Sequence, residues 1–271
     1  MELITALLTG FLSALSFGGI VADKAVEGAI TSRVNRVENI QVRIDNAPNL
    51  QILNGKADRV RMSAKGLWIT KDLRIDGFEL ETDPISINPK LLQGDPNKLR
   101  LESLPRPLQA GVKISLTEGD LNKALKSVEV LNRVQEVVSK GLAVFGGSAG
   151  IIYKVENPQV RFLAGNRLGF QMSLTEGTNA KNRLDLDLET GVEVSGGRKI
   201  KLTNTQGTVN RVPLPGFVLQ SIVDSVNNQA DLAVLESAGL TARILDIKMV
   251  DKRVELATFV RFQLPPGQKP R

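Results

Sequence analysis

Apolar and polar residues alternate in short runs between residues 49 and 94, and the runs end at glycine, Asp-Pro or Asn-Pro. Successive side chains of a β-strand point to opposite faces of a sheet. Each run therefore predicts a strand with one buried and one solvated face. The runs cover Arg59–Ala64, Leu73–Asp76 and Phe78–Glu81.

The same alternation recurs in four further segments and in a pair of runs near the end of the chain. The four segments are Ile40–Ile44, Val112–Leu116, Leu168–Leu174 and Leu184–Leu188. We expect all of them to be half-buried antiparallel strands. The final pair, residues 245–249 and 254–262, predicts a hairpin that turns near Asp251 and Lys252, with Leu245 on its apolar face.

Two segments carry apolar residues at helical spacing. The first helix is expected to open after Thr117, whose hydroxyl forms a near-capping box with Asp120, and to run to about Leu142. The second is expected to follow the proline and glycine breaker at residues 213–216. The apolar stripe of the first helix is Leu121, Leu125, Val128, Leu131, Val134, Val138 and Leu142, and that of the second is Phe217, Ile222, Val223 and Val226.

Residues 1–22 differ from the rest of the chain, because no charge interrupts them from Leu3 to Ala22. A run of this length can cross a bilayer, so we expect a signal or membrane-anchor segment. A buried or interfacial helix is the alternative, since Glu2 precedes the run and glycine, serine and threonine dilute it. Residues 23–262 are then expected to form a single α+β domain, and residues 263–271 a disordered tail.

The composition excludes several kinds of chemistry, because the 271 residues include no histidine and no cysteine. A Ser-His-Asp triad, a cysteine nucleophile and the usual zinc and haem sites all need those side chains. We therefore expect no catalytic residue, no metal site and no cofactor. The net charge of +6 favours anionic partners, but the scattered aromatic residues disfavour nucleic acid.

Three carboxylates share one predicted strand face at Asp185, Asp187 and Glu189. They would suit a hard cation, but we expect a solvated strand face, because no glycine-bearing calcium loop accompanies them. Residues 146–150 match the G-x-S-x-G pattern of a nucleophile elbow, but without a histidine base we expect a flexible loop there. A carboxylate pair of the glycosidase type would have to come from Asp58, Asp72, Asp76 and Asp83, for which surface charge is the ordinary role.

Basic residues gather in the first set of predicted strands. They are Arg59, Arg61, Lys65, Lys71 and Arg74. One interpretation is a basic patch that binds an anionic headgroup or membrane surface. The other is an outer sheet face on which these residues form salt bridges with Asp76, Glu79 and Glu81.

Several of these segments occur in the same order in a known family. The matching segments are the leucine-rich opening, the Leu53-Asn54-Gly55 turn, the extended strand pair and the Leu-Thr-x-x-Asp-Leu-Asn helix start at residues 116–122. Over residues 25–262 the chain resembles the LmeA-like phospholipid-binding family of bacterial envelope proteins, especially its cyanobacterial-looking members. The resemblance implies an α+β fold in which a curved antiparallel sheet wraps around a long helix with a second helix, similar to tubular lipid-binding domains.

The resemblance also implies where a lipid would bind. Acyl chains would lie between helix and sheet, and polar groups at the mouth would select the headgroup. A closed core without a cavity is the alternative, because sequence does not separate a filled interior from a lined one. The expected slot lining is Leu121, Leu125, Val128, Leu131, Val138, Phe217 and Ile222, with Arg59, Arg61, Lys65, Lys71 and Arg74 as the headgroup and membrane surface.

The function that we expect is non-enzymatic binding of a phospholipid, with a preference for an anionic one, at a bacterial membrane or envelope. The location would be membrane-associated, on the envelope or periplasmic side. Two alternatives stay open: an accessory or scaffold protein for an envelope enzyme, and a carboxylate-based hydrolase of envelope glycans.

Overall fold

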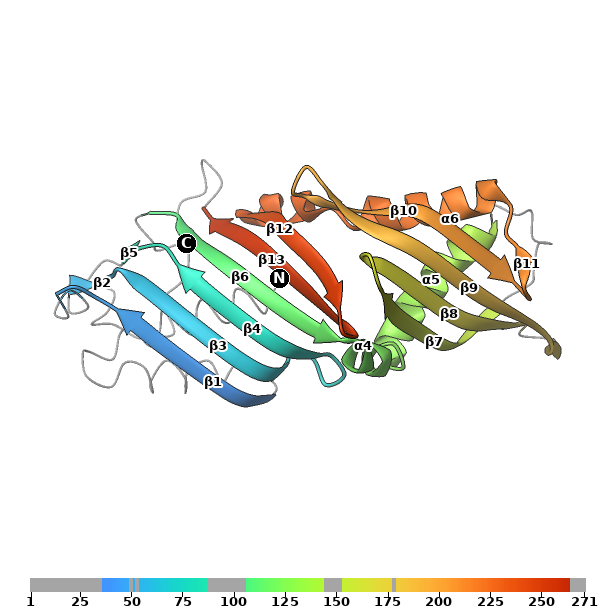
Figure 1. Cartoon of the computed structure of the whole chain (residues 1–271), viewed down its shortest axis with the longest axis horizontal. Coiled ribbons are helices and arrows are strands. Elements are labelled where there is room, and N and C mark those ends of the chain that lie inside the picture. The colour runs from blue at the N-terminus through green and yellow to red at the C-terminus, as the bar shows by residue number, and fades with distance from the viewer. Residues whose placement is uncertain are drawn as a thin grey trace. The chain divides into compact units, whose positions relative to one another are not determined.

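The computed structural model describes residues 36–48, 51, 54–86, 106–143, 153–176 and 179–263. The expected signal or anchor segment, the G-x-S-x-G stretch and the expected tail beyond Gln263 lie outside these residues. The described part of the chain forms antiparallel sheets with few helices (Figure 1). The expected α+β class with antiparallel sheets is thereby confirmed.

A six-stranded sheet has the strand order β1-β3-β4-β6-β13-β12. Its strands are β1 (Arg36–Asp45), β3 (Arg59–Trp68), β4 (Arg74–Thr82), β6 (Leu108–Thr117), β12 (Leu240–Val250) and β13 (Arg253–Phe262). The alternation predicted for β3 is confirmed, because Val60, Met62 and Ala64 are buried and Arg59 and Arg61 are exposed. Two short strands, β2 (Lys56–Ala57) and β5 (Ile85–Ser86), pair with each other.

The two runs that predict separate strands around residue 77 form the single strand β4. Gly77 lies inside this strand, opposite Lys65 of β3 and Ser115 of β6. A side chain at position 77 would collide with Ser115, since an added Cβ would lie 2.6 Å from the Ser115 hydroxyl oxygen. Gly77 therefore permits close strand packing rather than a turn.

The hairpin of β12 and β13 turns where the sequence predicts, at Asp251 and Lys252. Both residues have a positive φ, of 50° and 60°, as a tight two-residue turn requires. The prediction that Leu245 lies on the buried face is wrong, because its side chain is 68% exposed. The buried residues of β12 are Leu240, Ala242 and Ile244 in its first half and Met249 in its second half. The alternation of buried and exposed residues therefore changes phase in the middle of the strand.

The indole of Trp68 at the end of β3 lies between two arginines. Arg36 of β1 and Arg74 of β4 are the register partners of Trp68 on either side. Their guanidinium carbons lie 4.7 and 5.4 Å from the ring centroid. Both distances suit cation–π interactions, so Trp68 joins the ends of three strands.

A five-stranded sheet has the order β11-β10-β9-β8-β7. Its strands are β7 (Tyr153–Leu163), β8 (Arg167–Glu176), β9 (Asn179–Ser195), β10 (Lys199–Val209) and β11 (Val212–Pro213). The helices are α4 (Glu118–Ala124), α5 (Val128–Ala143), α6 (Gly216–Gln229) and the 3-10 helix η4 (Leu232–Ala238).

The described chain divides into two compact units. The second unit consists of Leu116–Asp231 and Asp246–Glu255, and the first contains the other described residues. The boundaries fall inside β6, β12 and β13, so these three strands contribute to both units. The expected single domain over residues 23–262 stays a prediction.

The helix expected from Thr117 to about Leu142 is instead two helices, α4 and α5. Its start is confirmed, because the Thr117 hydroxyl accepts a hydrogen bond of 3.0 Å from the Asp120 N–H. α4 ends at Ala124, and Ser127 then precedes α5 and accepts the Leu131 N–H at its carbonyl, 2.9 Å away. Serine is favoured at the position before a helix because its hydroxyl can accept a backbone N–H of the first turn. Here the Ser127 hydroxyl accepts the Val130 N–H at 3.4 Å.

Candidate functional site

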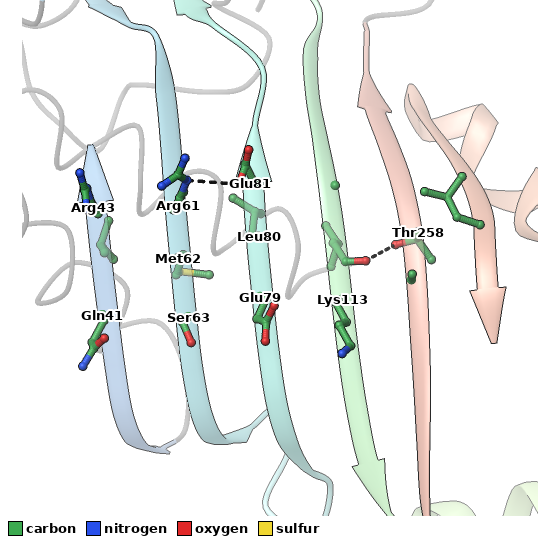
Figure 2. Close-up of a pocket in the computed structure, with 15 residues that line it drawn as sticks. Gln41, Arg43, Arg61, Met62, Ser63, Glu79, Leu80, Glu81, Lys113 and Thr258 are labelled. Atoms are coloured by element: carbon green, nitrogen blue, oxygen red, sulfur yellow. Dashed lines mark hydrogen bonds and ion pairs between the residues drawn. The ribbon is translucent and has the colours of Figure 1, made fainter. Parts of the chain in front are cut away.

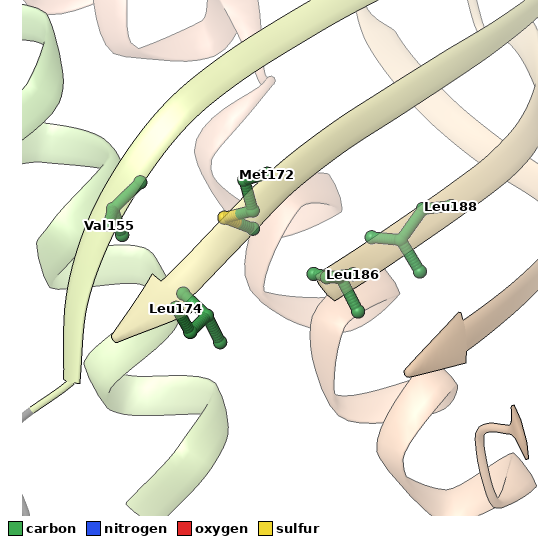
Figure 3. Close-up of a cluster of buried hydrophobic side chains, with 5 residues drawn as sticks. All are labelled: Val155, Met172, Leu174, Leu186 and Leu188. Atoms are coloured by element: carbon green, nitrogen blue, oxygen red, sulfur yellow. The ribbon is translucent and has the colours of Figure 1, made fainter. Parts of the chain in front are cut away.

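An apolar layer lies between the five-stranded sheet and helices α5 and α6 of the second unit. Its centre is a cluster of five buried side chains from three neighbouring strands (Figure 3). The cluster consists of Val155, Met172, Leu174, Leu186 and Leu188. Partly buried apolar side chains pack around it, namely Leu131, Val134, Val138, Tyr153, Phe170, Leu184, Val209, Leu214, Leu219 and Ile222. The partly buried side chains outnumber the buried ones, so part of the apolar surface of this layer remains exposed.

Three of the residues expected to line a slot pack against this cluster: Leu131, Val138 and Ile222. Leu121 and Leu125 are half-buried on α4 and directly after it. Val128 does not face the sheet, because it is the first residue of α5 and is 75% exposed. The interruption of the helix before Val128 is the cause.

Phe217 also points away from the layer, with 62% of its surface exposed. The neighbouring Val218 is buried instead, and Leu219 and Ile222 face the cluster. The inward side of α6 is therefore offset from the side that the sequence predicts. The spacing of three between Leu219 and Ile222 is the sequence signal that could have identified the inward side of α6.

Helix side chains bind the exposed edge of β7. The Asn122 side chain accepts the Val160 N–H at 2.7 Å and donates to the Val160 carbonyl at 2.9 Å. Gln135 of α5 similarly accepts the Val155 N–H at 2.8 Å and donates to the Tyr153 carbonyl. These bonds satisfy the backbone groups of an edge strand that would otherwise remain open.

Helix α6 binds the strand at the other side of the sheet in a similar way. The Leu202 N–H of β10 donates to the Asn227 side chain at 2.9 Å, and the Ile200 N–H donates to the Ala230 carbonyl at 3.1 Å. The two sets of bonds fix α5 and α6 over the same sheet, and the two helices also contact each other. Nothing in the sequence pattern pairs Asn122, Gln135 or Asn227 with a strand, so these positioning residues were not predicted.

The three carboxylates on the face of β9 are each paired with an arginine. Arg183 lies 2.8 Å from Asp185, Arg161 lies 3.3 Å from Asp187 and Arg167 lies 3.0 Å from Glu189. Among the described residues, no group of three or more acidic side chains could hold a metal ion. The solvated strand face is therefore the interpretation that the contacts support.

The hydrogen bond from Arg183 lowers the pKa of Asp185 below the usual aspartate value, and a second from Ser173 adds to the effect. A lowered carboxyl pKa in the folded state stabilises the protein above the ordinary pKa and loses that contribution as the pH falls through the lowered value. We expect Arg183→Gln to raise the pKa of Asp185, measured by NMR titration of its carboxyl carbon. Arg167→Gln is the matched control and should leave that titration unchanged.

The predicted basic patch is largely a salt-bridged sheet face. Arg59 and Arg61 lie 3.3 and 3.2 Å from the Glu81 carboxylate, and Arg74 lies 3.1 Å from both Glu38 and Asp76. Lys65 and Lys71, also of the predicted patch, are exposed. The second of the two sequence interpretations, an ion-paired outer face, therefore describes the three arginines.

A hollow of about 850 Å³ opens over this face of the first unit (Figure 2). Two rows of register partners cross it from β1 to β6. One row is Arg43, Arg61, Glu81 and Gly111, and the next is Gln41, Ser63, Glu79 and Lys113. Each row contains both cationic and anionic side chains, so the hollow does not present a field of one sign.

No helix among the described residues is long and apolar enough to cross a membrane. A search of curated proteins and a search of solved structures found no match. Residues 14–259, most of the chain, match the model of a family described as LmeA-like phospholipid-binding. The chain belongs to the LmeA-like phospholipid-binding family.

Proposed function

We propose that this protein binds phospholipid without catalysing a reaction, and that acyl chains lie in the apolar layer of the second unit. The observation that carries the proposal is the ring of partly buried apolar side chains around the small buried cluster. An acyl chain in contact with them would gain about 0.8 kcal/mol for each methylene group removed from water. Family membership supports a phospholipid as the ligand.

The proposed arrangement has the five-stranded sheet curving around α5, with α6 as the second helix. The bonds of Asn122 and Gln135 to β7, and of Asn227 to β10, support it, because they attach the helices to strands at both sides of the sheet. In the proposed arrangement, lipid enters at an end of the layer.

The remaining parts of the proposal concern location and lipid type. We place the protein at a bacterial membrane, on the envelope or periplasmic side, with a preference for anionic phospholipid. The apolar segment at residues 1–22 and the net charge of +6 support these two points. Lys65 and Lys71, which are exposed, are the best candidates within the predicted headgroup surface.

Mass spectrometry of an organic extract of natively purified protein tests the proposal. We expect phospholipid in amounts that approach one molecule per chain. Protein that carries no lipid, and takes up none from vesicles, would contradict the proposal and favour a scaffold role.

A variant that fills the layer gives a second test. Val134→Phe adds bulk to an inward side of α5 and should displace about two methylene groups of the ligand, which lowers affinity about tenfold. The melting temperature should change little, because the added ring takes the volume of the lipid. A closed core would instead lose about 1–3 kcal/mol of stability on overpacking. Val128→Phe, on the exposed start of the same helix, is the control and should alter neither property.

A further inference from the structure

The connection from β10 to α6 and the first turn of α6 each carry one large apolar side chain that is exposed to solvent. Val212 is 65% exposed and Phe217 is 62% exposed, although they are only five positions apart. Arg211, Pro213 and Pro215 are exposed as well. We call residues 211–217 the tip of the second unit; β11 lies within it (Figure 1).

The backbone of the tip holds these side chains outward. Asn210 and Arg211 have positive φ values of 50° and 68° and form a tight turn between β10 and β11. Proline at 213 and 215 fixes two further φ angles. Val212 thus directly follows an ordered turn, and Phe217 lies in the first turn of α6.

The middle of the tip is anchored in the apolar layer. The Leu214 N–H donates to the Gly207 carbonyl at 2.9 Å, and the Leu214 side chain packs beside the buried cluster. A side chain at Gly207 would collide with Leu188, whose Cδ2 would lie 2.3 Å from the added Cβ. Glycine therefore lets Leu214 approach, and the tip adjoins one end of the layer where we propose that acyl chains lie.

We propose that the tip docks on a phospholipid bilayer, with Val212 and Phe217 inserted at the boundary between headgroups and acyl chains. Exposed apolar side chains gain free energy by leaving water, and Arg211, which is exposed and precedes Val212 in the sequence, supplies a guanidinium that can bind a lipid phosphate. This inference deepens the proposed function and rests on it for the choice of a lipid partner. It assigns Phe217 to the bilayer instead of to the slot.

Site-specific fluorescence tests the contact in the full chain, whatever else attaches the protein to the membrane. The sequence has no cysteine, so Phe217→Cys labelled with an environment-sensitive dye reports one position. With vesicles of phosphatidylglycerol and phosphatidylcholine, we expect a blue shift and quenching by brominated acyl chains. Val250→Cys, at a 57% exposed residue of the β12–β13 hairpin, is the matched control and should show neither.

Loss of the two apolar side chains gives the quantitative test. The double variant V212S/F217S should weaken vesicle binding about tenfold relative to V250S, because two partly buried apolar side chains are lost from the bilayer. A dye at position 217 that stays in water on vesicles, or equal binding of the two variants, would overturn the inference. A dye that responds to a protein partner but not to vesicles would do the same. The lipid content of the purified variants is measured separately, so a failed slot and a failed tip remain distinguishable.

Discussion

Replacing Phe78 with alanine should lower the free energy of unfolding by about 3–5 kcal/mol, the range for deleting a buried phenyl ring. Phe78 is 2% exposed and lies in β4 between Ala64 of β3 and Ile114 of β6. The neighbour on β3 is already small, so its side chain has little bulk with which to fill the cavity. Urea unfolding followed by circular dichroism gives the measurement.

Phe217→Ala is the matched control for Phe78→Ala, because it makes the same change at an exposed site. It should alter the free energy of unfolding by no more than about 0.5 kcal/mol. Equal losses in the two variants would show that Phe78 is not part of a tightly packed interior.

Replacing Asn122 or Gln135 with leucine should each destabilise the second unit by about 1–3 kcal/mol, because each change leaves backbone groups of β7 without partners. The apolar side chain has a similar length, so the loss of hydrogen bonds dominates. Native-state hydrogen exchange should show faster exchange of the Val160 amide in Asn122→Leu and of the Val155 amide in Gln135→Leu.

Asn132→Leu is the matched control for these two variants, since Asn132 lies on the exposed side of α5. It should leave the exchange rates of β7 unchanged. Uniform acceleration across β7, β8 and β9 in the variants would contradict a local role and indicate global destabilisation instead.

The strands were predictable because their signal is local. In β3 the buried residues Val60, Met62 and Ala64 each lie between two polar ones, and the sequence alone shows the period. Pairing between strands is not local: Arg61 lies opposite Glu81 because of the register between β3 and β4. The sequence therefore offered both a basic patch and an ion-paired face, and the register decides in favour of the second.

The helices were less predictable, because no glycine or proline marks the interruption between α4 and α5. Lys126 and Ser127 lie there, and a new helix begins directly after Ser127. The change of phase in β12 falls at two adjacent apolar residues, Ile244 and Leu245, of which only Ile244 is buried. The prediction of the slot depended on the interruption of the helix, since Val128 takes its exposed position from it.

Each unit contains one aromatic residue that can report its unfolding. In the first unit this residue is Trp68, which lies between Arg36 and Arg74. Trp68 is the single tryptophan of the chain and belongs to the first unit, and Tyr153 is the single tyrosine and belongs to the second. Release of the two guanidinium groups from the indole should change the tryptophan emission when the first unit unfolds. The near-ultraviolet circular dichroism should lose the contribution of Tyr153, which packs on the cluster of the second unit, when that unit unfolds. One denaturation experiment on the unmodified protein can therefore establish whether the units that share β6, β12 and β13 unfold together or in sequence.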